Sequence, residues 1–424
     1  MKRRAGDRRQ KSIFDPIHGS VSLPDAPLAL LGDPAFQRLW GIRQTGLAHL
    51  VFPGANHTRL EHSLGVYWVA RQMAHALELD PSDAEAVGIG GLLHDLGHPP
   101  LSHTLDGPMR EALGVTHEGR SRALVLGTDR GEADPRATPS RIPQILQRHG
   151  LDPRAIADLI DPPAGSERHP LLRALLHGPI DADRIDYLQR DAHYTGVAHG
   201  AIDASRLLDT LKARGHRLVF AEKGRNAVEG FVVGRSLMYS SVYYHKTVRA
   251  AEVMAQAALE RMRGYPAIAR PLLAQTEGDL FGALESGGGY PGRMVRALRE
   301  RRLYKRVQAW RTVPTGRRAA LLPLVRRPAR RREVEDHLSD AIGAPAGSVL
   351  LDLSGITDTA GERAEWASVG ILEHDRVTYP FRSPGLWREI ALRPKNPWPV
   401  SVYAAPRYEQ PMVRYLGRHP DLGV

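Results

Sequence analysis

A histidine and an aspartate stand side by side at the end of an apolar stretch that belongs in a protein core. Residues 84–93 are small and apolar and predict a buried helix, and His94 and Asp95 follow directly. A buried imidazole and a buried carboxylate are costly unless something binds them, and a metal ion would satisfy both. Because His98 lies four residues after His94, the spacing places both imidazoles on one helix face. The sequence therefore predicts a metal centre here.

The residues after this pair extend the polar cluster. Gly97 and two prolines predict the end of the helix, and the chain then brings back His103, with Asp106 three residues further on. A hard or borderline divalent ion takes imidazole nitrogen and carboxylate oxygen and leaves positions for water and phosphate. An adjacent His-Asp pair is nevertheless common, and a single buried histidine is more often a satisfied core residue than a ligand. The spacing alone leaves both interpretations open.

Composition limits the classes of protein that the chain can represent. Its 424 residues suffice for one large domain and a smaller one, and the formal net charge of +11 favours polyanionic ligands such as nucleotides or nucleic acid. A genome-wide preference for arginine is the alternative explanation of that charge. The chain has no cysteine, which excludes disulfides and zinc-thiolate sites. With no apolar run near the ~18 residues of a membrane span, we expect a cytoplasmic protein without a membrane partner.

Helical patterns dominate the first two thirds of the chain. They predict helices over residues 27–42, 59–79, 84–93, 141–149, 153–160, 170–177 and 227–262. Strands are predicted at 14–19 and 21–23, and a hairpin at 218–225. Beyond residue 264 the composition changes: residues 299–306 and 317–332 are dense in arginine, and 349–353, 377–379 and 400–403 alternate like strands. We expect a mainly α fold with a smaller α+β C-terminal region.

Several segments together resemble a known family, the HD-domain phosphohydrolases. The resemblance rests on Arg59-Leu-Glu-His62-Ser-Leu-Gly, His94-Asp95-Leu-Gly-His98, Ser102-His103 and Asp181-Ala-Asp183-Arg184-Ile-Asp-Tyr187. Further segments are similar to the deoxynucleoside triphosphate triphosphohydrolase branch, which includes the SAM-and-HD-domain dNTPase: Phe14-Asp-Pro-Ile-His-Gly19, Phe36-Gln-Arg-Leu39, Val51-Phe-Pro-Gly-Ala55 and Tyr244-His-Lys246. The resemblance covers residues 13–265 well and implies an HD-domain helical bundle.

The resemblance selects a ligand set that spacing could not select. It implies that His62, His94, Asp95 and Asp183 hold a divalent ion, either manganese, iron, magnesium, nickel or zinc. A second magnesium on the substrate phosphates is also implied. The resemblance further implies that His103 transfers a proton at the scissile bond while Asp106 orients it. His98 and His117 match further histidines near the phosphates.

The resemblance also implies which residues bind the nucleotide. Positions matching phosphate ligands are Arg59, Arg184 and Arg235, whose guanidinium groups can contact phosphate oxygens in a bidentate way. Positions matching hydrogen-bonding partners of the sugar 3′-hydroxyl are Gln44, Tyr187 and Asp191. Tyr243 matches a ring beside the sugar and base. Each assignment has a simpler structural alternative: Arg59 could pair within its own helix, and Tyr239 and Tyr243 could form an ordinary core stripe.

Departures from the family pattern affect substrate choice. Thr45 stands where the SAM-and-HD enzyme has a bulky leucine beside the sugar 2′ position, so a 2′-hydroxyl could be tolerated or bound. Tyr239 and Tyr244 stand where that enzyme has histidine and glutamine near the nucleotide. The base preference of the family therefore does not transfer to this chain. No SAM domain precedes residue 13 in this sequence.

The predicted function is metal-dependent hydrolysis of (deoxy)nucleoside triphosphates to nucleoside and inorganic triphosphate. The alternatives are a phosphohydrolase of another nucleotide, such as a ribonucleotide, monophosphate or modified nucleotide, and a nucleotide-sensing nucleic-acid-binding protein. The resemblance implies a homo-oligomer, from dimer to hexamer, and an allosteric nucleotide. The arginine clusters by default form a solvated face, and a site there for single-stranded nucleic acid is the alternative interpretation. The predicted organisation is a basic flexible arm at 1–12, a catalytic body at 13–265 and a basic α+β region at 266–424.

Overall fold

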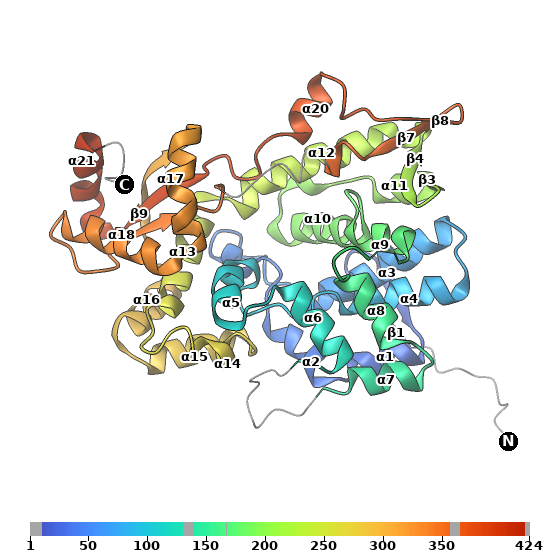
Figure 1. Ribbon diagram of the computed structural model, residues 1–424, viewed down its shortest axis with the longest axis horizontal. Coiled ribbons are helices and arrows are strands. Elements are labelled where there is room, and N and C mark those ends of the chain that lie inside the picture. The colour runs from blue at the N-terminus through green and yellow to red at the C-terminus, as the bar shows by residue number, and fades with distance from the viewer. Residues whose placement is uncertain (1–10, 130–139, 167, 357–364, 420–424) are drawn as a thin grey trace.

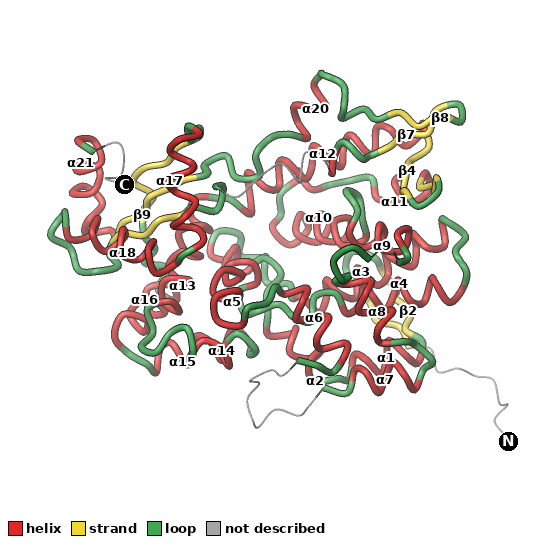
Figure 2. Tube along the Cα trace, in the orientation of Figure 1, coloured by secondary structure: helices red, strands yellow, loops and turns green. Residues whose placement is uncertain are grey.

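Helices make up most of the described part of this protein, and the predicted metal ligands lie on or next to three of them, at widely separated places in the chain (Figure 1). The computed structural model describes residues 11–129, 140–166, 168–356 and 365–419. Strands are few and lie mostly at two edges of the molecule, as Figure 2 shows in yellow. The prediction of a mainly α fold with strands in the C-terminal region is confirmed. The predicted arm lies outside the described residues except for Lys11 and Ser12, which belong to a strand instead.

Three helices form the centre of the helical body: α3 (Arg59–Ala76), α4 (Pro81–Leu93) and α10 (Ala182–Thr195). Helix α3 packs against both of the others. It starts at a capping box, in which the backbone N–H of Thr58 donates to Oε2 of Glu61 at 2.6 Å, and this fixes His62 one turn inside the helix. The prediction of a helix starting at Arg59 is confirmed.

Helix α4 ends earlier than the sequence pattern indicates. Its last residue is Leu93, so His94 caps the helix and residues 94–97 form a turn. The prediction that His94 and His98 share a helix face is therefore wrong. Gly97 permits the close turn, because a Cβ there would lie 2.1 Å from the carbonyl oxygen of His117. The turn sends His98 toward α6 instead.

The remaining helices of the body enclose these three. They are α1 (Asp25–Leu31), α2 (Pro34–Gln37), α5 (Asp106–Leu113), α6 (His117–Leu126), α7 (Ile142–Arg148), α8 (Pro153–Ile160), α9 (Pro170–His177), α11 (Ala204–Thr210), α12 (Arg225–Met238) and α13 (Lys246–Glu260), with short 3-10 turns η1 (Arg38–Gly41), η2 (Gly46–Leu50) and η3 (Ser102–Leu105). The C-terminal part adds α14 (Ala269–Leu272), α15 (Glu277–Ser286), α16 (Gly289–Arg299), α17 (Thr315–Arg326), α18 (Pro328–Asp340), α20 (Leu386–Ala391) and α21 (Glu409–Arg418).

Two predicted long helices are broken. The helix predicted over residues 27–42 divides into α1, α2 and η1, because Pro34 lacks an N–H and Asp33 caps a new helix by accepting from the Ala35 N–H at 2.9 Å. The helix predicted over 227–262 divides at a π-helical turn, η6 (Tyr239–Tyr243), after which His245 caps α13. Such π turns are rare and frequent at functional sites.

The strands form three small sheets. An N-terminal hairpin pairs β1 (Lys11–Asp15) with β2 (Gly19–Leu23), close to the two strands predicted there. A second sheet has the order β3-β4-β7-β8, from β3 (Leu211–Arg214), β4 (Arg217–Ala221), β7 (Gly370–Glu373) and β8 (Arg376–Thr378). A third has the order β5-β9-β6, from β5 (Lys305–Trp310), β9 (Val400–Ala404) and β6 (Val349–Asp352).

The hairpin predicted over residues 218–225 is displaced. Strand β4 pairs with β3, which precedes it, across a turn at Gly215, and the chain enters α12 after β4. The predicted strands at 349–353, 377–379 and 400–403 are present as β6, β8 and β9. The short strands β5 and β7 escaped prediction, since β5 lies in an arginine-rich segment and β7 is only four residues long.

The C-terminal part of the chain is interwoven with the body. Strand β7 pairs in parallel with β4, so the red C-terminal segment lies beside the green hairpin in Figure 1. One hydrophobic cluster combines Val66 of α3 and Phe231 of α12 with Trp366 and Ile371. A second combines residues of α13 with Leu350 and Tyr403. Packing thus crosses the predicted boundary at residue 265. Within the described ranges, no helix is both long enough and apolar enough to cross a membrane.

Candidate active site

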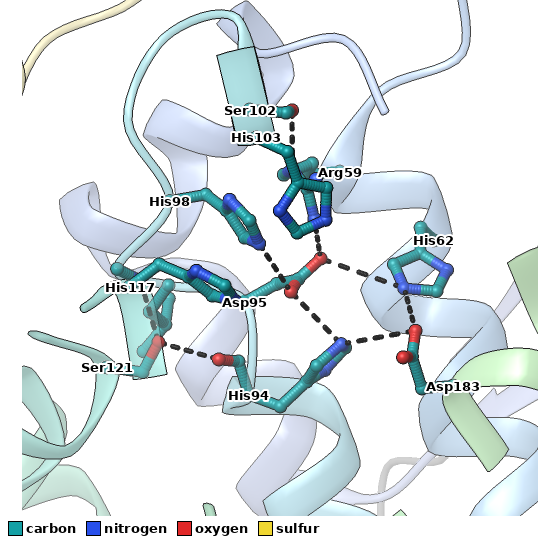
Figure 3. Close-up of polar contacts among 12 residues, drawn as sticks. Arg59, His62, His94, Asp95, His98, Ser102, His103, His117, Ser121 and Asp183 are labelled. Atoms are coloured by element: carbon teal, nitrogen blue, oxygen red, sulfur yellow. Dashed lines mark hydrogen bonds and ion pairs between the residues drawn. The ribbon is translucent and has the colours of Figure 1, made fainter. Parts of the chain in front are cut away.

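Three of the four predicted metal ligands offer their ligand atoms to one point. Atoms of His62, His94 and Asp183 lie within 4.8 Å of one another, from α3, the end of α4 and the first turn of α10 (Figure 3). The Nε2 atom of His62 lies 3.0 Å from Oδ1 of Asp183, and the Nε2 atom of His94 lies 3.8 Å from the same oxygen. Both Nε2 atoms are buried and make no hydrogen bond. Two buried imidazole nitrogens without partners beside a carboxylate fit a divalent ion.

The fourth predicted ligand, Asp95, adjoins this group from the side. Its Oδ1 lies 3.1 Å from Nε2 of His94, and its Oδ2 lies 3.7 Å from Nε2 of His62. Oδ2 also accepts a hydrogen bond from Nη1 of Arg59 at 2.5 Å. The positively charged guanidinium of Arg59 is therefore in direct contact with one of the predicted metal ligands.

The pKa values of His62 and Asp183 are shifted in the directions that favour a positive charge between them. Burial opposes protonation of His62, but the neighbouring carboxylates of Asp183 and Asp186 raise its pKa to about 10. Burial likewise opposes the ionised form of Asp183, but His62 and His94 hold its pKa below the usual value. A cation is thus favoured between these side chains, and a metal ion would take the place of the protons.

A second imidazole cluster lies next to the first. Ligand atoms of His98, His103, Asp106 and His117 lie within 4.8 Å of one another, and the rings of His98 and His117 stack at 3.8 Å. Nδ1 of His103 lies 3.1 Å from Oδ2 of Asp106, and His103 is mostly exposed. The structure therefore brings together the proton-transfer pair of the resemblance, His103 and Asp106, and the two further histidines that it places near the phosphates.

The two buried histidines of this second cluster have opposite charge preferences. Burial, together with the nearby Arg59 charge, lowers the pKa of His98 well below its usual value. For His117 burial acts in the same direction, but hydrogen bonds to Asp106 and Glu118 raise its pKa to about 9. At neutral pH these opposite shifts favour a neutral His98 and a charged His117.

Beside these clusters lies a cavity of about 530 Å³. Its lining includes predicted substrate-binding residues from four separate segments, as well as His103: Gln44, Thr45, Arg59, Tyr187, Asp191, Tyr239 and Tyr243. The four predicted metal ligands lie behind this wall, where Arg59 connects the cavity to Asp95. The cavity is large enough for a ligand of nucleotide size.

Asp191 is held firmly in the cavity wall. One oxygen, Oδ1, lies 2.7 Å from Nε2 of His57, and the other, Oδ2, accepts from the Tyr243 hydroxyl at 2.5 Å. Burial and the Asp191 charge raise the pKa of Tyr243 well above its usual value, so its hydroxyl stays a donor. The π turn places Tyr239 and Tyr243 in edge contact at 5.0 Å between ring centroids.

Gln44 and Thr45 contribute polar atoms that the protein does not satisfy. Oε1 of Gln44 and Oγ1 of Thr45 are buried, line the cavity wall and have no hydrogen-bond partner. Buried polar atoms normally have a hydrogen-bond partner, so two such atoms without a partner in a cavity wall fit the binding of a polar ligand.

Two predicted phosphate ligands are placed elsewhere. Arg184 forms an ion pair with Glu365 and donates to the carbonyl oxygen of Pro179 at 3.0 Å. The Arg235 guanidinium is buried between the rings of Tyr239 and Trp366, at 4.7 Å and 5.2 Å from their centroids. Neither arginine is among the residues that line the large cavity.

Some residues at the cavity escaped sequence reasoning. Ser102 accepts from Nε of Arg59 at 2.7 Å, and Asp352 binds the Arg249 guanidinium through two hydrogen bonds of 2.9 Å. The adjacency of Ser102 to His103 was a usable signal. For Asp352 there was none, because it reaches the cavity only through the packing of β6 against α13.

Comparisons with known proteins agree with this geometry. The HD domain family matches residues 59–191, and the HD-associated region matches residues 202–413. The uncharacterized protein YwfO of Bacillus subtilis is 36% identical over 265 residues, which are 61% of this chain and 57% of that protein. The deoxynucleoside triphosphate triphosphohydrolase SAMHD1 of Homo sapiens is 33% identical over 218 residues, covering 44% of this chain and 34% of that protein. The chain spans about half the length of the curated relatives it matches.

A solved structure supports the fold over nearly the whole chain. A hypothetical protein from Aquifex aeolicus has a TM-score of 0.72 at 25% identity, covering 96% of this chain and 100% of that one. The C-terminal strands and helices are thus part of a recurring architecture.

Proposed function

We propose that this chain, which belongs to the HD-domain family of metal-dependent phosphohydrolases and to its deoxynucleoside triphosphatase-like branch, hydrolyses (deoxy)nucleoside triphosphates to a nucleoside and inorganic triphosphate. The observation that carries the proposal is that Arg59 connects an unsatisfied imidazole–carboxylate group to the adjoining cavity. A cytoplasmic location is expected from the lack of cysteine and is part of the same proposal.

The residues that would hold the metal are His62, His94, Asp95 and Asp183. A divalent ion bound there would supply Lewis-acid polarisation at the phosphorus nearest the nucleoside. Which ion serves is open among manganese, iron, magnesium, nickel and zinc. A second magnesium on the substrate phosphates is part of the proposal.

The chain's own residues provide positioning and proton transfer. Arg59, fixed by Ser102 and Asp95, would face the phosphates with its remaining N–H groups. Attack by water at the innermost phosphorus breaks the bond to the 5′ oxygen, which then needs a proton. His103 would give it, because Asp106 engages Nδ1 and leaves Nε2 for the leaving group. His117, charged at neutral pH, would balance phosphate charge.

The test is product analysis. Purified protein is incubated with each of the four dNTPs and Mn²⁺ or Mg²⁺, and the products are separated by anion exchange. We expect nucleoside and inorganic triphosphate, and no product from D183N. Release of nucleoside monophosphate and pyrophosphate would refute the proposed cleavage site.

A second candidate substrate class is ribonucleotides. The observation that favours it is the buried, unpartnered Oγ1 of Thr45 in the cavity wall, next to the unpartnered Oε1 of Gln44. A 2′-hydroxyl could bond with either. To separate the two substrate classes, kcat/KM is measured for NTPs and dNTPs with the wild type and with T45V. If T45V loses turnover of NTPs but keeps turnover of dNTPs, then Thr45 recognises the ribose 2′-hydroxyl.

Partners are part of the proposal as well. We expect a homo-oligomer, dimer to hexamer, with an allosteric nucleotide, which light scattering with and without nucleotide can test. Single-stranded nucleic acid is a further proposed partner, because guanidinium groups of Arg306 and Arg311 lie 4.9 Å and 4.6 Å from the Trp398 ring centroid. Binding should weaken steeply with salt.

A further inference from the structure

One buried carboxylate, Asp186, connects the metal-binding group to the N-terminal hairpin. It lies on α10, one turn after Asp183, and is fully buried. Its Oδ2 accepts from Nδ1 of His62 at 2.7 Å and from Nε of Arg190 at 2.9 Å. Its Oδ1 accepts from Nη2 of Arg190 at 2.9 Å and lies 2.6 Å from Nε2 of His18. Four donors therefore converge on one carboxylate.

The hairpin supplies two of the polar side chains in the network around Asp186. Oδ1 of Asp15 accepts from the backbone N–H groups of Ile17 and His18, each at 2.9 Å, and so shapes the turn that presents His18. Oδ2 of Asp15 accepts from Nη1 of Arg190 at 2.8 Å. The His18 ring also stacks on Trp68 of α3 at 4.5 Å. The segment around Asp15 and His18, for which the proposed chemistry has no role, is thus tied to a metal ligand through Asp186.

The packing around Asp186 is tight enough to require a glycine. Gly65 follows His62 by three residues on α3, and a Cβ there would lie 1.8 Å from Oδ1 of Asp186 and 2.4 Å from Nη2 of Arg190. Both atoms are buried and held by several partners, so neither can move aside cheaply. Only a residue without a side chain lets the carboxylate reach His62.

We propose that Asp186, held in place by His18, Arg190 and Asp15, is a positioning residue that orients His62 for metal binding. As the acceptor at Nδ1, it keeps the proton on that nitrogen and leaves the Nε2 lone pair for the ion. His94 obtains the same tautomer from a backbone acceptor, the carbonyl oxygen of Gly91 at 2.8 Å from Nδ1. His62 alone depends on a side chain and on the N-terminal hairpin.

The inference rests on the metal centre of the proposed function but not on the reaction. Its readout is metal affinity, so a wild-type protein that binds the ion without turning over a nucleotide would refute the function and leave the inference intact. The competing explanation is that the network only stabilises the fold, since a buried charge cluster often does no more.

The experiment measures Mn²⁺ dissociation constants of full-length, chelator-treated protein by calorimetry, with the apo melting temperature recorded for each variant. We expect D186N to bind Mn²⁺ about 10–100-fold more weakly, the range of such outer partners. G65A, which displaces the carboxylate without removing a charge, should weaken binding in the same direction. G230A on α12 is the matched control, because a Cβ there meets nothing within 4 Å.

Two milder variants, both at His18, allow the same test if D186N fails to fold. H18A removes one donor from Asp186 and should weaken Mn²⁺ binding several-fold, whereas H18Q can place an amide N–H near the position of Nε2 and should restore it. Folded H18A and G65A that melt lower but bind Mn²⁺ as tightly as wild type would overturn the inference in favour of a purely structural role.

Discussion

The carboxylate of Glu365 forms an ion pair with the guanidinium of Arg184, so the C-terminal part of the chain neutralises a cation expected to hold phosphate. Both side chains are largely buried, and the carboxyl group of Asp181 lies 3.8 Å from Nε of Arg184. A triphosphate could gain Arg184 only by displacing Glu365. Glu365 and the substrate phosphates would therefore compete for Arg184.

Removing that competitor should tighten substrate binding. We expect E365Q to lower KM for the triphosphate several-fold with kcat little changed, because the amide holds the arginine less firmly than a carboxylate. Steady-state kinetics of the Mn²⁺-loaded enzyme measures this. E373Q is the matched control, since Glu373 pairs with Arg225 at similar exposure and away from the cavity. An unchanged KM in E365Q would mean that Arg184 does not contact the phosphates.

Loss of a metal ligand should abolish binding and stabilisation together. Wild type with Mn²⁺ at 100 times its dissociation constant should gain about 2.7 kcal/mol over the apo protein, because only the folded state binds. H94A and D183N should show no such gain in thermal unfolding and no activity. H75A serves as control, since His75 is exposed near the end of the same α3 helix. Stabilisation retained in both ligand variants would place the ion elsewhere.

The hydrogen bond between Tyr243 and Asp191 should be measurable as stability. Y243F leaves one oxygen of a buried carboxylate without its donor, which costs about 1–3 kcal/mol. Urea unfolding of the apo protein gives this value, with Y415F on α21 as a control outside the cavity. If Y243F unfolds at the same urea concentration as wild type, then water satisfies Asp191 and the bond contributes little.

The raised pKa of His117 predicts a definite pH dependence. A group whose folded pKa, about 9, exceeds its unfolded value of about 6.5 stabilises the folded state fully below 6.5, and this contribution is lost as pH rises through 9. H117Q should therefore be more destabilising near pH 6 than near pH 10. Urea unfolding of both proteins with chelator present measures the difference. A gap that stays constant over this range would contradict the assigned pKa.

Much of the catalytic body could be predicted because its motifs are local. The helix from Arg59, the His94-Asp95 pair and the helices over residues 153–160 and 170–177 depend on local caps, prolines and apolar periodicity. The course of the chain after Leu93 could not be predicted in the same way. The spacing of His94 and His98 fits one helix face, and the sequence gives no sign of the close approach of Gly97 to His117 that accompanies the turn.

Contacts between segments that are far apart in the sequence could not be predicted from local sequence patterns. The pairing of Arg184 with Glu365 joins residues far apart in the chain, and no periodicity connects them. The π turn at Tyr239–Tyr243 was also hidden, because its tyrosines have the same spacing as an ordinary helical stripe. The cavity wall formed by Asp352 depends on the same long-range packing.

The parallel register of β4 and β7, from Val219↔Gly370 to Ala221↔Leu372, has a consequence for how this polypeptide can be divided. A fragment ending at residue 265 would leave one edge of β4 open to intermolecular pairing and Phe231 without its neighbour Trp366. We expect such a fragment to precipitate on expression. If the chain is divided at residue 265 and the two fragments are expressed together, they could associate into an active protein by complementation.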